Sequence, residues 1–392
     1  MAHSLCIMLV AAEPSGDALG AGLMHALRQR LGRKVRFVGV GGAQMQAEGL
    51  ESLFDISDLS IWGWAEGIMA YPRVIARADQ TAALAIKERP DAAVLIDSWG
   101  FTLRVGQRLR RRIPDLLLIK YVGPQVWAAR PGRAKTLAQT FDHLLSILAF
   151  DAPFFEREGL PVTKVGYPAL AVAPDAHPER ARNRIGADQD DQILLVLPGS
   201  RPSEISSLMP PFGQAAALLK QNRPALQIVV VVAPSVAEAV KTEAAKWSSR
   251  PHLIEGESLK QDAMRAATVA LACSGTVPTE LAIAGCPMVV AYKVSALSAF
   301  LIRMMIKTRY ITLFNIAAGR DIAPELVQGQ CNGPALAKAV AARLDDAQLR
   351  NDQIAAQSAA LALLGPLEGA DPSQRAADAV IGLLKARGLP ST

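Results

Sequence analysis

An arginine stands in a turn where a strand gives way to a helix, in the segment LVLPGSRPSEI at residues 195–205. The apolar run at 193–197 predicts a buried strand, and Pro, Gly and Ser then end it. Free backbone N–H groups and the positive end of a helix dipole meet at such a junction and bind anions. A guanidinium can donate two parallel hydrogen bonds to phosphate oxygens. Ser200 and Arg201 are therefore predicted to bind a phosphate or diphosphate.

A second turn of the same kind follows the expected strand at residues 269–272. Ser274, Gly275 and Thr276 place small side chains and hydroxyls at a helix N-terminus, which predicts another anion site. Glu280 lies one turn further along and could accept hydrogen bonds from ribose hydroxyls. A capping-box role for Glu280, paired with the backbone near Thr276, explains the same spacing, so both interpretations stay open at this point.

Two carboxylates follow expected parallel strands in the first half of the chain. Glu13 lies in the segment AAEPSGD, after the strand expected at 5–11, and Asp97 ends the apolar run at 92–96. Side chains at the carboxyl ends of parallel strands face a ligand crevice. Asp97 is thus a candidate general base, with a cap on the next helix as an equally good alternative. An inverting glycosyl transfer needs only one base, whereas a hydrolase normally uses a carboxylate pair.

Two further polar sets carry weaker signals. Ser15 and Asp17 follow Glu13 in a turn that, on spacing alone, is a capped strand-to-helix connection. The turn lacks the G-x-G-x-x-G pattern of a dinucleotide site. Asn315 and Gln328 stand in an otherwise apolar segment, which alone indicates only a loop and a helix.

The segment KYVGPQVWAARPGRAK at residues 120–135 interrupts another strand with Gly, Pro and Gln. Gln125 and Trp127 stand beside Arg130 and Arg133, and an aromatic ring among cations suits a sugar or phosphate partner. The alternative is a solvated, basic start of a helix. That alternative explains the charges but not the turn.

Two apolar stretches with basic neighbours concern membranes, one at residues 56–77 and one at 295–310. The default interpretation of each is a core-facing helix. Tryptophans, basic edges and a positive net charge also favour insertion at a membrane interface or binding of acyl chains. The residues expected at the membrane or at acyl chains are Ile61, Trp62, Trp64, Ile68, Met69 and Ile75. The arginines expected to attract anionic lipid are Arg108, Arg110, Arg111 and Arg112.

Expected strands and helices alternate along the chain, which predicts parallel sheets covered by helices. A Pro- and Ala-rich stretch at 166–178 predicts a linker between an N-terminal domain at 1–170 and a C-terminal domain at 171–365. A last helix near 373–387 would let residues 366–392 complete the first domain. The predicted fold is α/β, with two doubly wound Rossmann-like domains facing each other across a cleft.

Composition narrows the partners and the compartment. The chain has 392 residues, 51% hydrophobic and 20% charged, which is enough for two globular domains. A net charge of +6 favours anionic partners, while 5% aromatics without a base-stacking pattern make nucleic acid the weaker option. Four cysteines without a C-x-x-C pair and five scattered histidines predict reduced thiols and no metal site. We find neither a signal peptide nor an apolar run of the roughly 18 residues that span a bilayer, so a cytosolic or peripheral location is expected.

Taken together, seven segments of the chain resemble the lipid-A-disaccharide synthase family of GT-B glycosyltransferases. They occur in the family's order and span nearly the whole chain: AAEPSGDALGA, GGAQMQAEG, LIDSWGFTLR, YVGPQVWAARPGRAK, LPGSRPSEI, SGTVPTELAIAGCPMVVAYK and NIAAGRDIAPELVQ. The residues that match the family pattern include Asp97, Arg201, Glu280 and Asn315. The chain departs from the usual family residues at Ala12, Tyr167 and Phe314.

The resemblance implies that UDP-2,3-diacylglucosamine donates its sugar to 2,3-diacylglucosamine 1-phosphate. The products would be a β-1,6-linked disaccharide phosphate and UDP, formed by an inverting displacement without a metal or other cofactor. Asp97 would be the base, and Arg201 would stabilise the leaving diphosphate. The implied UDP contacts are Ser200, Arg201, Ser274, Gly275, Thr276, Glu280, Asn315 and Gln328. The implied acceptor or sugar contacts are Glu13, Ser15, Asp17, Gln125 and Trp127.

The same resemblance implies a peripheral protein on the anionic, cytoplasmic face of the inner membrane, and the last helix could mediate a homodimer. Three rival hypotheses stay open. The first is a GT-B enzyme of soluble UDP-sugars, such as a UDP-N-acetylglucosamine 2-epimerase, which leaves the Trp-rich stretch at 61–75 unexplained. The second is a non-catalytic protein that binds UDP and docks on membranes. The third, a nucleic-acid binder, rests on the pI of about 9.2 alone.

Overall fold

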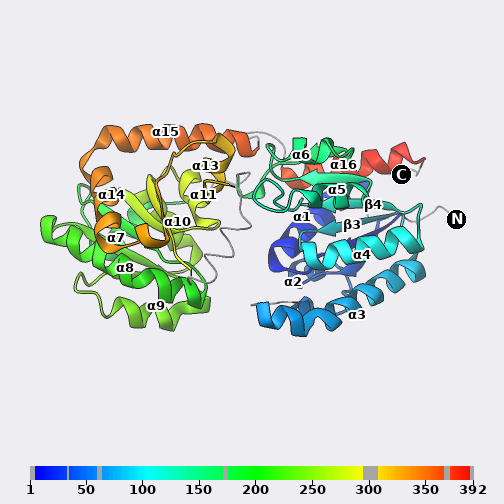
Figure 1. Cartoon of the computed structure of the whole chain (residues 1–392), viewed down its shortest axis with the longest axis horizontal. Helices are drawn as coiled ribbons and strands as arrows, with labels where there is room; N and C mark the ends of the chain where they lie inside the picture. The colour runs from blue at the N-terminus through cyan, green and yellow to red at the C-terminus, as the bar shows by residue number, and fades with distance from the viewer. Residues whose placement is uncertain are drawn as a thin grey trace. The chain divides into compact units, whose positions relative to one another are not determined.

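The computed structural model describes residues 5–32, 35–59, 64–170, 175–294, 308–365 and 371–388, with the backbone alone for 64–70 and 169. The chain forms two units, each with its own core. The N-terminal unit comprises Met1–Ala171 and Glu368–Thr392, and the C-terminal unit comprises Val172–Leu367. In Figure 1 each unit is a sheet with helices packed against it.

The sheet of the N-terminal unit is parallel, with the strand order β2-β1-β3-β4-β5-β6. Its strands are β1 Cys6–Val10, β2 Arg36–Val40, β3 Ala92–Ile96, β4 Leu117–Tyr121, β5 His143–Ser146 and β6 Val162–Lys164. The three strands β1, β3 and β4 are buried along their whole length. This burial is typical of parallel strands that are covered by helices on both faces.

Helices cover the two faces of this sheet in two apolar layers. One layer contains α1 and α16, and the other contains α3, α4 and α5. The helices of the unit are α1 Pro14–Leu31, α2 Ala43–Ala47, α3 Trp64–Glu88, α4 Trp99–Arg112, α5 Gly132–Ala138, α6 Ala152–Glu156 and α16 Pro372–Ala386, with the 3-10 turns η2 Ile56–Leu59 and η3 Pro168–Leu170. The last helix α16 packs on α1, and Arg30 on α1 pairs with Asp378 on α16 at 2.9 Å. The end of the chain is therefore part of the N-terminal unit.

The C-terminal unit contains a second parallel sheet, with the order β12-β11-β10-β7-β8-β9. Its strands are β7 Ile193–Leu197, β8 Gln227–Val232, β9 His252–Glu255, β10 Val269–Cys273, β11 Met288–Tyr292 and β12 Glu325–Val327. Its helices are α7 Pro178–Ile185, α8 Pro202–Asn222, α9 Ala237–Ala244, α10 Glu257–Ala266, α11 Val277–Ile283, α13 Leu313–Ala318, α14 Gly333–Asp345 and α15 Ala347–Leu364, with the 3-10 turns η4 Pro234–Val236 and η5 Gln328–Gln330. One apolar layer joins α8, α9 and α14 to the sheet.

The strand orders place one topological switch point in each unit. In the N-terminal unit the direction of winding reverses between β1 and β3, and in the C-terminal unit between β7 and β10. In doubly wound sheets, ligands bind outside the carboxyl ends of the strands at this point. The two sheets confirm the predicted doubly wound α/β fold. How the domains face each other stays a prediction.

No helix in the part of the chain described above is both long enough and apolar enough to cross a bilayer.

Candidate active site

The switch point of the N-terminal unit brings together side chains from two connections. Glu13 precedes α1 as its N-cap residue, and Ser15 lies in the first turn of that helix. Asp97 follows β3, and Ser15 Oγ donates a hydrogen bond to Asp97 Oδ2 at 3.5 Å. Burial of its carboxyl raises the pKa of Glu13, and the charge of Asp97 raises it further. The connections after β1 and β3 thus place two carboxylates and a hydroxyl at one edge of the sheet.

The backbone that carries Asp97 adopts a rare conformation. Asp97 has a φ of 47° and Ser98 a φ of 39°, so two consecutive residues other than glycine are left-handed. Such residues cost of order 1–3 kcal/mol each and cluster at functional sites. Ser98, not Asp97, is the N-cap residue of α4, so this structure does not favour the alternative in which Asp97 caps that helix.

A buried lysine lies beneath this turn. Lys120 on β4 is 1% exposed, and its Nζ donates hydrogen bonds to the Asp97 carbonyl oxygen and to Thr102 Oγ1. Burial lowers the pKa of Lys120 to about 7, against opposite effects of the charges of Asp97 and Glu13. No motif of the sequence assigned Lys120 to the site. The only signal was one cation after four apolar residues in LLLIKY.

Asp17 has a different position from the one expected of a sugar contact. It is 3% exposed, and its carboxylate accepts hydrogen bonds from the backbone N–H groups of Gly42, Gln44 and Met45 at 2.7–3.1 Å. Its oxygens therefore hold the start of α2 against α1. This corrects the expectation: Asp17 supports the connection after β1 and does not present its carboxylate to a ligand.

The segment after β4 contains the other two expected acceptor contacts. Gln125 is exposed, whereas Trp127 is partly buried, with its ring 5.4 Å from the ring of Phe150. The indole Nε1 of Trp127 is buried and has no hydrogen-bond partner among the described residues. The Arg133 guanidinium lies 5.0 Å from the ring of Trp99 at the start of α4. The first contact connects the segment after β4 to the loop after β5, and the second connects α5 to α4.

The expected membrane residues are only partly described. Ile61 and Trp62 lie outside the described residues, as do residues 295–307 of the second apolar stretch. The backbone of Trp64, Ile68 and Met69 belongs to α3, but their side chains are not described. Ile75, further along α3, is partly buried, which agrees with the default interpretation for this residue.

Arg201 occupies the switch point of the C-terminal unit, as the N-cap residue of α8. Its side chain is 67% exposed, and one guanidinium nitrogen lies 2.9 Å from Glu204 Oε1. The other Glu204 oxygen accepts the backbone N–H groups of Ser200 and Arg201 at 2.9 and 3.2 Å. Two backbone N–H groups of the predicted anion site thus donate to a carboxylate of the chain. The guanidinium remains the exposed cationic group of this turn.

The second turn predicted to bind an anion follows β10, the strand next to β7. Gly275 has a φ of 144° and, like Thr276, is exposed, with open space where a Cβ would lie. The Ser274 N–H donates to the carbonyl of Ala291 on the neighbouring strand at 3.2 Å. The turn is therefore anchored at Ser274 and open at the next two residues.

Glu280 on α11 has a charged partner that the sequence analysis did not identify. Lys260 Nζ on α10 lies 2.8 Å from Glu280 Oε2, and the two side chains are 17% and 25% exposed. This ion pair fixes the direction of the carboxylate. The structure does not favour the capping-box alternative, because among the described residues no backbone N–H donates to the Glu280 carboxylate and the side chain of Thr276, the N-cap residue of α11, makes no capping bond.

Asn315 is buried completely and its amide is fully engaged. The amide nitrogen donates to the Ala323 carbonyl and to Glu325 Oε1 at 2.8 and 2.9 Å, and the amide oxygen accepts N–H groups of Ile322 and Ala323. A direct contact between Asn315 and UDP, as expected from the sequence, is not available in this structure. The residue instead joins α13 to β12.

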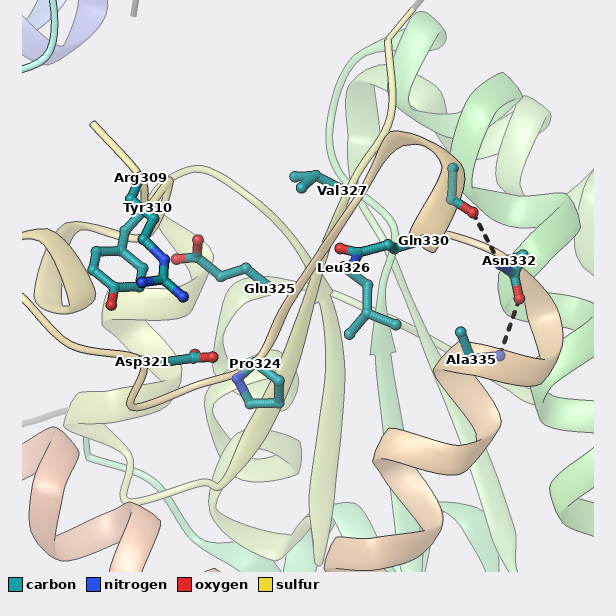
Figure 2. A pocket seen from close by; sticks show the side chains of 11 residues that line it. Arg309, Tyr310, Asp321, Pro324, Glu325, Leu326, Val327, Gln330, Asn332 and Ala335 are labelled. Atoms are coloured by element: carbon teal, nitrogen blue, oxygen red, sulfur yellow. Dashed lines mark hydrogen bonds between the residues drawn. The ribbon is translucent and has the colours of Figure 1, made fainter. Parts of the chain in front are cut away.

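Gln328 lies at the end of β12 with a φ of 53°. A pocket of about 590 Å³ lies along this strand, and Figure 2 shows its labelled side chains on both sides of β12. Glu325, on one side, also accepts the N–H groups of Ile311 and Thr312. Asn332, on the other side, caps α14 through the Ala335 N–H. The pocket borders the segment of Gln328, and two of its polar lining residues, Glu325 and Asn332, are engaged by hydrogen bonds within the protein.

Comparison with known proteins gives the family. The model of the family described as lipid-A-disaccharide synthetase matches residues 7–377, which include both switch points. The chain belongs to this family. It is accordingly a glycosyltransferase of lipid A disaccharide synthesis.

Individual proteins agree with this membership. A lipid-A-disaccharide synthase of Rhodospirillum centenum is 44% identical over 384 residues, which cover 98% of this chain and 96% of that protein. A lipid-A-disaccharide synthase of Paramagnetospirillum magneticum is 43% identical over 97% of this chain and 98% of its own length. A crystal structure from Listeria monocytogenes, described as a UDP-N-acetylglucosamine 2-epimerase, has a TM-score of 0.64 at 15% identity, covering 99% of this chain and 98% of that one. The last likeness shows the GT-B fold alone, and the family favours the synthase over the epimerase hypothesis.

Proposed function

We propose that this protein transfers 2,3-diacylglucosamine from UDP-2,3-diacylglucosamine to the 6-hydroxyl of 2,3-diacylglucosamine 1-phosphate. Family membership supports the reaction. The observation that carries the residue roles is the difference between the switch points: one presents Asp97 with Ser15, the other presents Arg201. One of the two carboxylates at the first switch point and the cation at the second suit a displacement that needs one base and one diphosphate-binding group.

In the proposed step, the acceptor oxygen forms a bond to the anomeric carbon of the donor sugar. The bond from that carbon to the diphosphate oxygen breaks, and its electron pair leaves with UDP. The hydroxyl proton of the acceptor passes to the Asp97 carboxylate. General-base catalysis of this kind accelerates a reaction about 10²–10⁴-fold. The acceptor sugar would be bound by Glu13, which follows β1, and by Gln125 and Trp127, which follow β4. Ser15 would orient Asp97.

Arg201 would leave Glu204 and pair with the diphosphate when the donor binds. The guanidinium can exchange partners because it is exposed, whereas Glu204 is held by backbone N–H groups. The open turn at Gly275 and Thr276 adds N–H groups and a hydroxyl beside it. Glu280, directed by Lys260, would bind the ribose hydroxyls. In this proposal side-chain cations supply the charge that a metal ion supplies in other enzymes, so turnover needs no metal.

Attachment to an anionic membrane surface would involve α3 and α4. The ring of Tyr71 on α3 is 52% exposed, and the Arg104 guanidinium of α4 lies 5.1 Å from its centroid. Aromatic and basic side chains combine in this way at membrane interfaces. The predicted arginine cluster attracts anionic lipid less strongly than four free arginines would, because Arg108 and Arg112 pair with Asp79. The protein would then lie on the cytoplasmic face of the inner membrane, and a homodimer would use the part of α16 that does not contact α1.

Turnover tests this proposal directly. The purified protein is incubated with both diacylated substrates in detergent, and disaccharide phosphate and UDP are followed by mass spectrometry, with and without EDTA. We expect stoichiometric disaccharide and UDP in both conditions. UDP binding without disaccharide would favour a reaction of soluble UDP-sugars or a non-catalytic protein, and loss of turnover in EDTA that added metal restores would contradict the metal-independent step.

A further inference from the structure

Lys120 lies where the packing of the N-terminal sheet leads one to expect an apolar residue. It is the fourth residue of β4, a strand that is buried along its length. Its neighbours across the sheet are Leu95 on β3 and Leu144 on β5. Moving an ammonium group out of water is unfavourable unless hydrogen bonds and opposite charges compensate. The partners of Lys120 therefore indicate what the residue does.

Those partners belong to the turn that carries Asp97. Lys120 Nζ donates to the Asp97 carbonyl oxygen and, at 2.7 Å, to Thr102 Oγ1. The Thr102 hydroxyl lies 2.6 Å from the Asp97 carbonyl oxygen and 2.9 Å from the Ser98 carbonyl oxygen. An ammonium group and a hydroxyl thus bind the two carbonyl groups of this turn from its buried side.

The turn needs such support because its backbone is left-handed at Asp97 and Ser98. Residues other than glycine persist in this region only where the surroundings hold them there. A charge-assisted hydrogen bond is stronger than one between neutral groups, so the ammonium group is well suited to the task. A shift of this turn would move the Asp97 carboxylate away from Ser15.

The charge of Lys120 also acts on the carboxylates above it. The charged groups that face it are Glu13, from the connection between β1 and α1, and Asp97, from the connection between β3 and α4. Thr102, from α4, is polar but uncharged. The ammonium charge lowers the pKa of Glu13, although burial and Asp97 outweigh it. Because the pKa of Lys120 is about 7, the charge is present throughout the acidic range.

We infer that Lys120 is a positioning residue of this glycosyltransferase: it holds the left-handed turn that aims Asp97, and its positive charge acts on the Glu13 carboxylate beside that turn. The inference rests on the proposed role of Asp97 as the proton acceptor. Lys120 is 1% exposed, so in this inference it acts through the turn and not by contact with either substrate.

The test compares three variants with the wild type in disaccharide formation between pH 5 and pH 8. Lys120→Met keeps most of the length of the side chain and removes the ammonium group, with its charge and its hydrogen bonds. We expect kcat to fall at least about 10-fold, the donor KM to change less than about 2-fold, and the acidic limb of the kcat profile to move to higher pH. Thr102→Val keeps the charge and removes the hydroxyl, so kcat should fall less and the acidic limb should not move. Lys164→Met, at the exposed end of β6, is the control and should match the wild type.

If folded Lys120→Met has an unchanged kcat and an unmoved acidic limb, the inference is wrong. A lower kcat with an unmoved acidic limb would also overturn it, because that result indicates that Lys120 only supports the fold. A second readout does not depend on turnover. The carboxyl 13C signal of Glu13, identified by its loss in Glu13→Gln, should titrate at higher pH in Lys120→Met than in the wild type. A wild type that forms no disaccharide would refute the proposed function, and the Glu13 titration would still decide whether Lys120 controls the charge of this site. If Lys120→Met does not fold, Thr102→Val decides the positioning role, since its kcat must fall while its Glu13 titration stays unchanged.

Discussion

The two units present opposite charges at the same topological position. At the switch point of the N-terminal unit, Asp97 is the outer group and Lys120 is buried beneath its turn. At the switch point of the C-terminal unit, Arg201 is exposed and Glu204 is held beneath its turn by backbone N–H groups. Each turn therefore combines one outward charge with an inner charge of the opposite sign that fixes the backbone.

This difference shows what a doubly wound fold does and does not determine. The fold determines where a ligand binds, at the carboxyl ends of the strands on either side of the switch point. It does not determine the chemistry, which comes from the side chains placed there. A carboxylate can accept a proton and a guanidinium can bind a diphosphate, so in the proposed reaction one architecture used twice supplies both halves of a glycosyl transfer. Substitutions in the two units separate these halves.

The largest effect is expected from Asp97→Asn. The amide keeps the size of the side chain but cannot accept the acceptor proton, so kcat should fall at least about 100-fold. UDP affinity should stay within about 2-fold of the wild type, because the diphosphate-binding residues belong to the other unit. Initial rates of disaccharide formation and calorimetric titration with UDP measure the two quantities. Asp190→Asn, an exposed carboxylate of the C-terminal unit, is the control. Near-normal turnover of Asp97→Asn would exclude the role of this residue as the base.

Arg201→Ala should instead lower both kcat and the affinity for UDP. Loss of one preorganised group that stabilises the departing diphosphate lowers kcat by about 10²-fold, and loss of a charge-assisted contact weakens UDP binding by about 10-fold. The same assays apply, with Arg265→Ala, an exposed arginine on α10, as the control. The comparison between the units fails if Arg201→Ala binds UDP as tightly as the wild type does.

A smaller effect is expected from Lys260→Met, which tests the second charge pair of the C-terminal unit. Without its partner at 2.8 Å, the partly buried carboxylate of Glu280 loses the ion pair that fixes its direction. We expect UDP to bind about 5- to 10-fold more weakly, a change of about 1 kcal/mol. At saturating donor the rate should change little. Lys246→Met removes an exposed ion pair with Glu243 and should leave UDP affinity unchanged. A fall in kcat without a change in UDP affinity would contradict a role of Lys260 in UDP binding.

The sequence was sufficient to predict the two turns, because apolar runs followed by small or charged residues identify the ends of buried strands. It was also sufficient to predict parallel sheets, since strands and helices alternate. It could not predict which polar side chains would form their hydrogen bonds within the protein. Asp17 follows a strand and Asn315 lies on α13, yet backbone groups from other segments, and for Asn315 also the Glu325 carboxylate, bind their side chains. Pairings such as Lys260 with Glu280 join residues from separate helices, and no local pattern reports them.

The smallest effect is expected from Ser15→Ala. The hydroxyl lies 3.5 Å from Asp97 Oδ2, at the outer limit of a hydrogen bond, so it orients the carboxylate only weakly. We expect kcat to fall about 2- to 3-fold, which corresponds to about 0.5 kcal/mol. If Ser15 acts only through Asp97, the double variant Ser15→Ala, Asp97→Asn should be no slower than Asp97→Asn alone. A loss of 100-fold or more in Ser15→Ala, or an additive loss in the double variant, would show that the hydroxyl takes part in proton transfer itself. The N-terminal switch point would then hold two reacting groups, and the contrast with the C-terminal unit would rest on more than the sign of one charge.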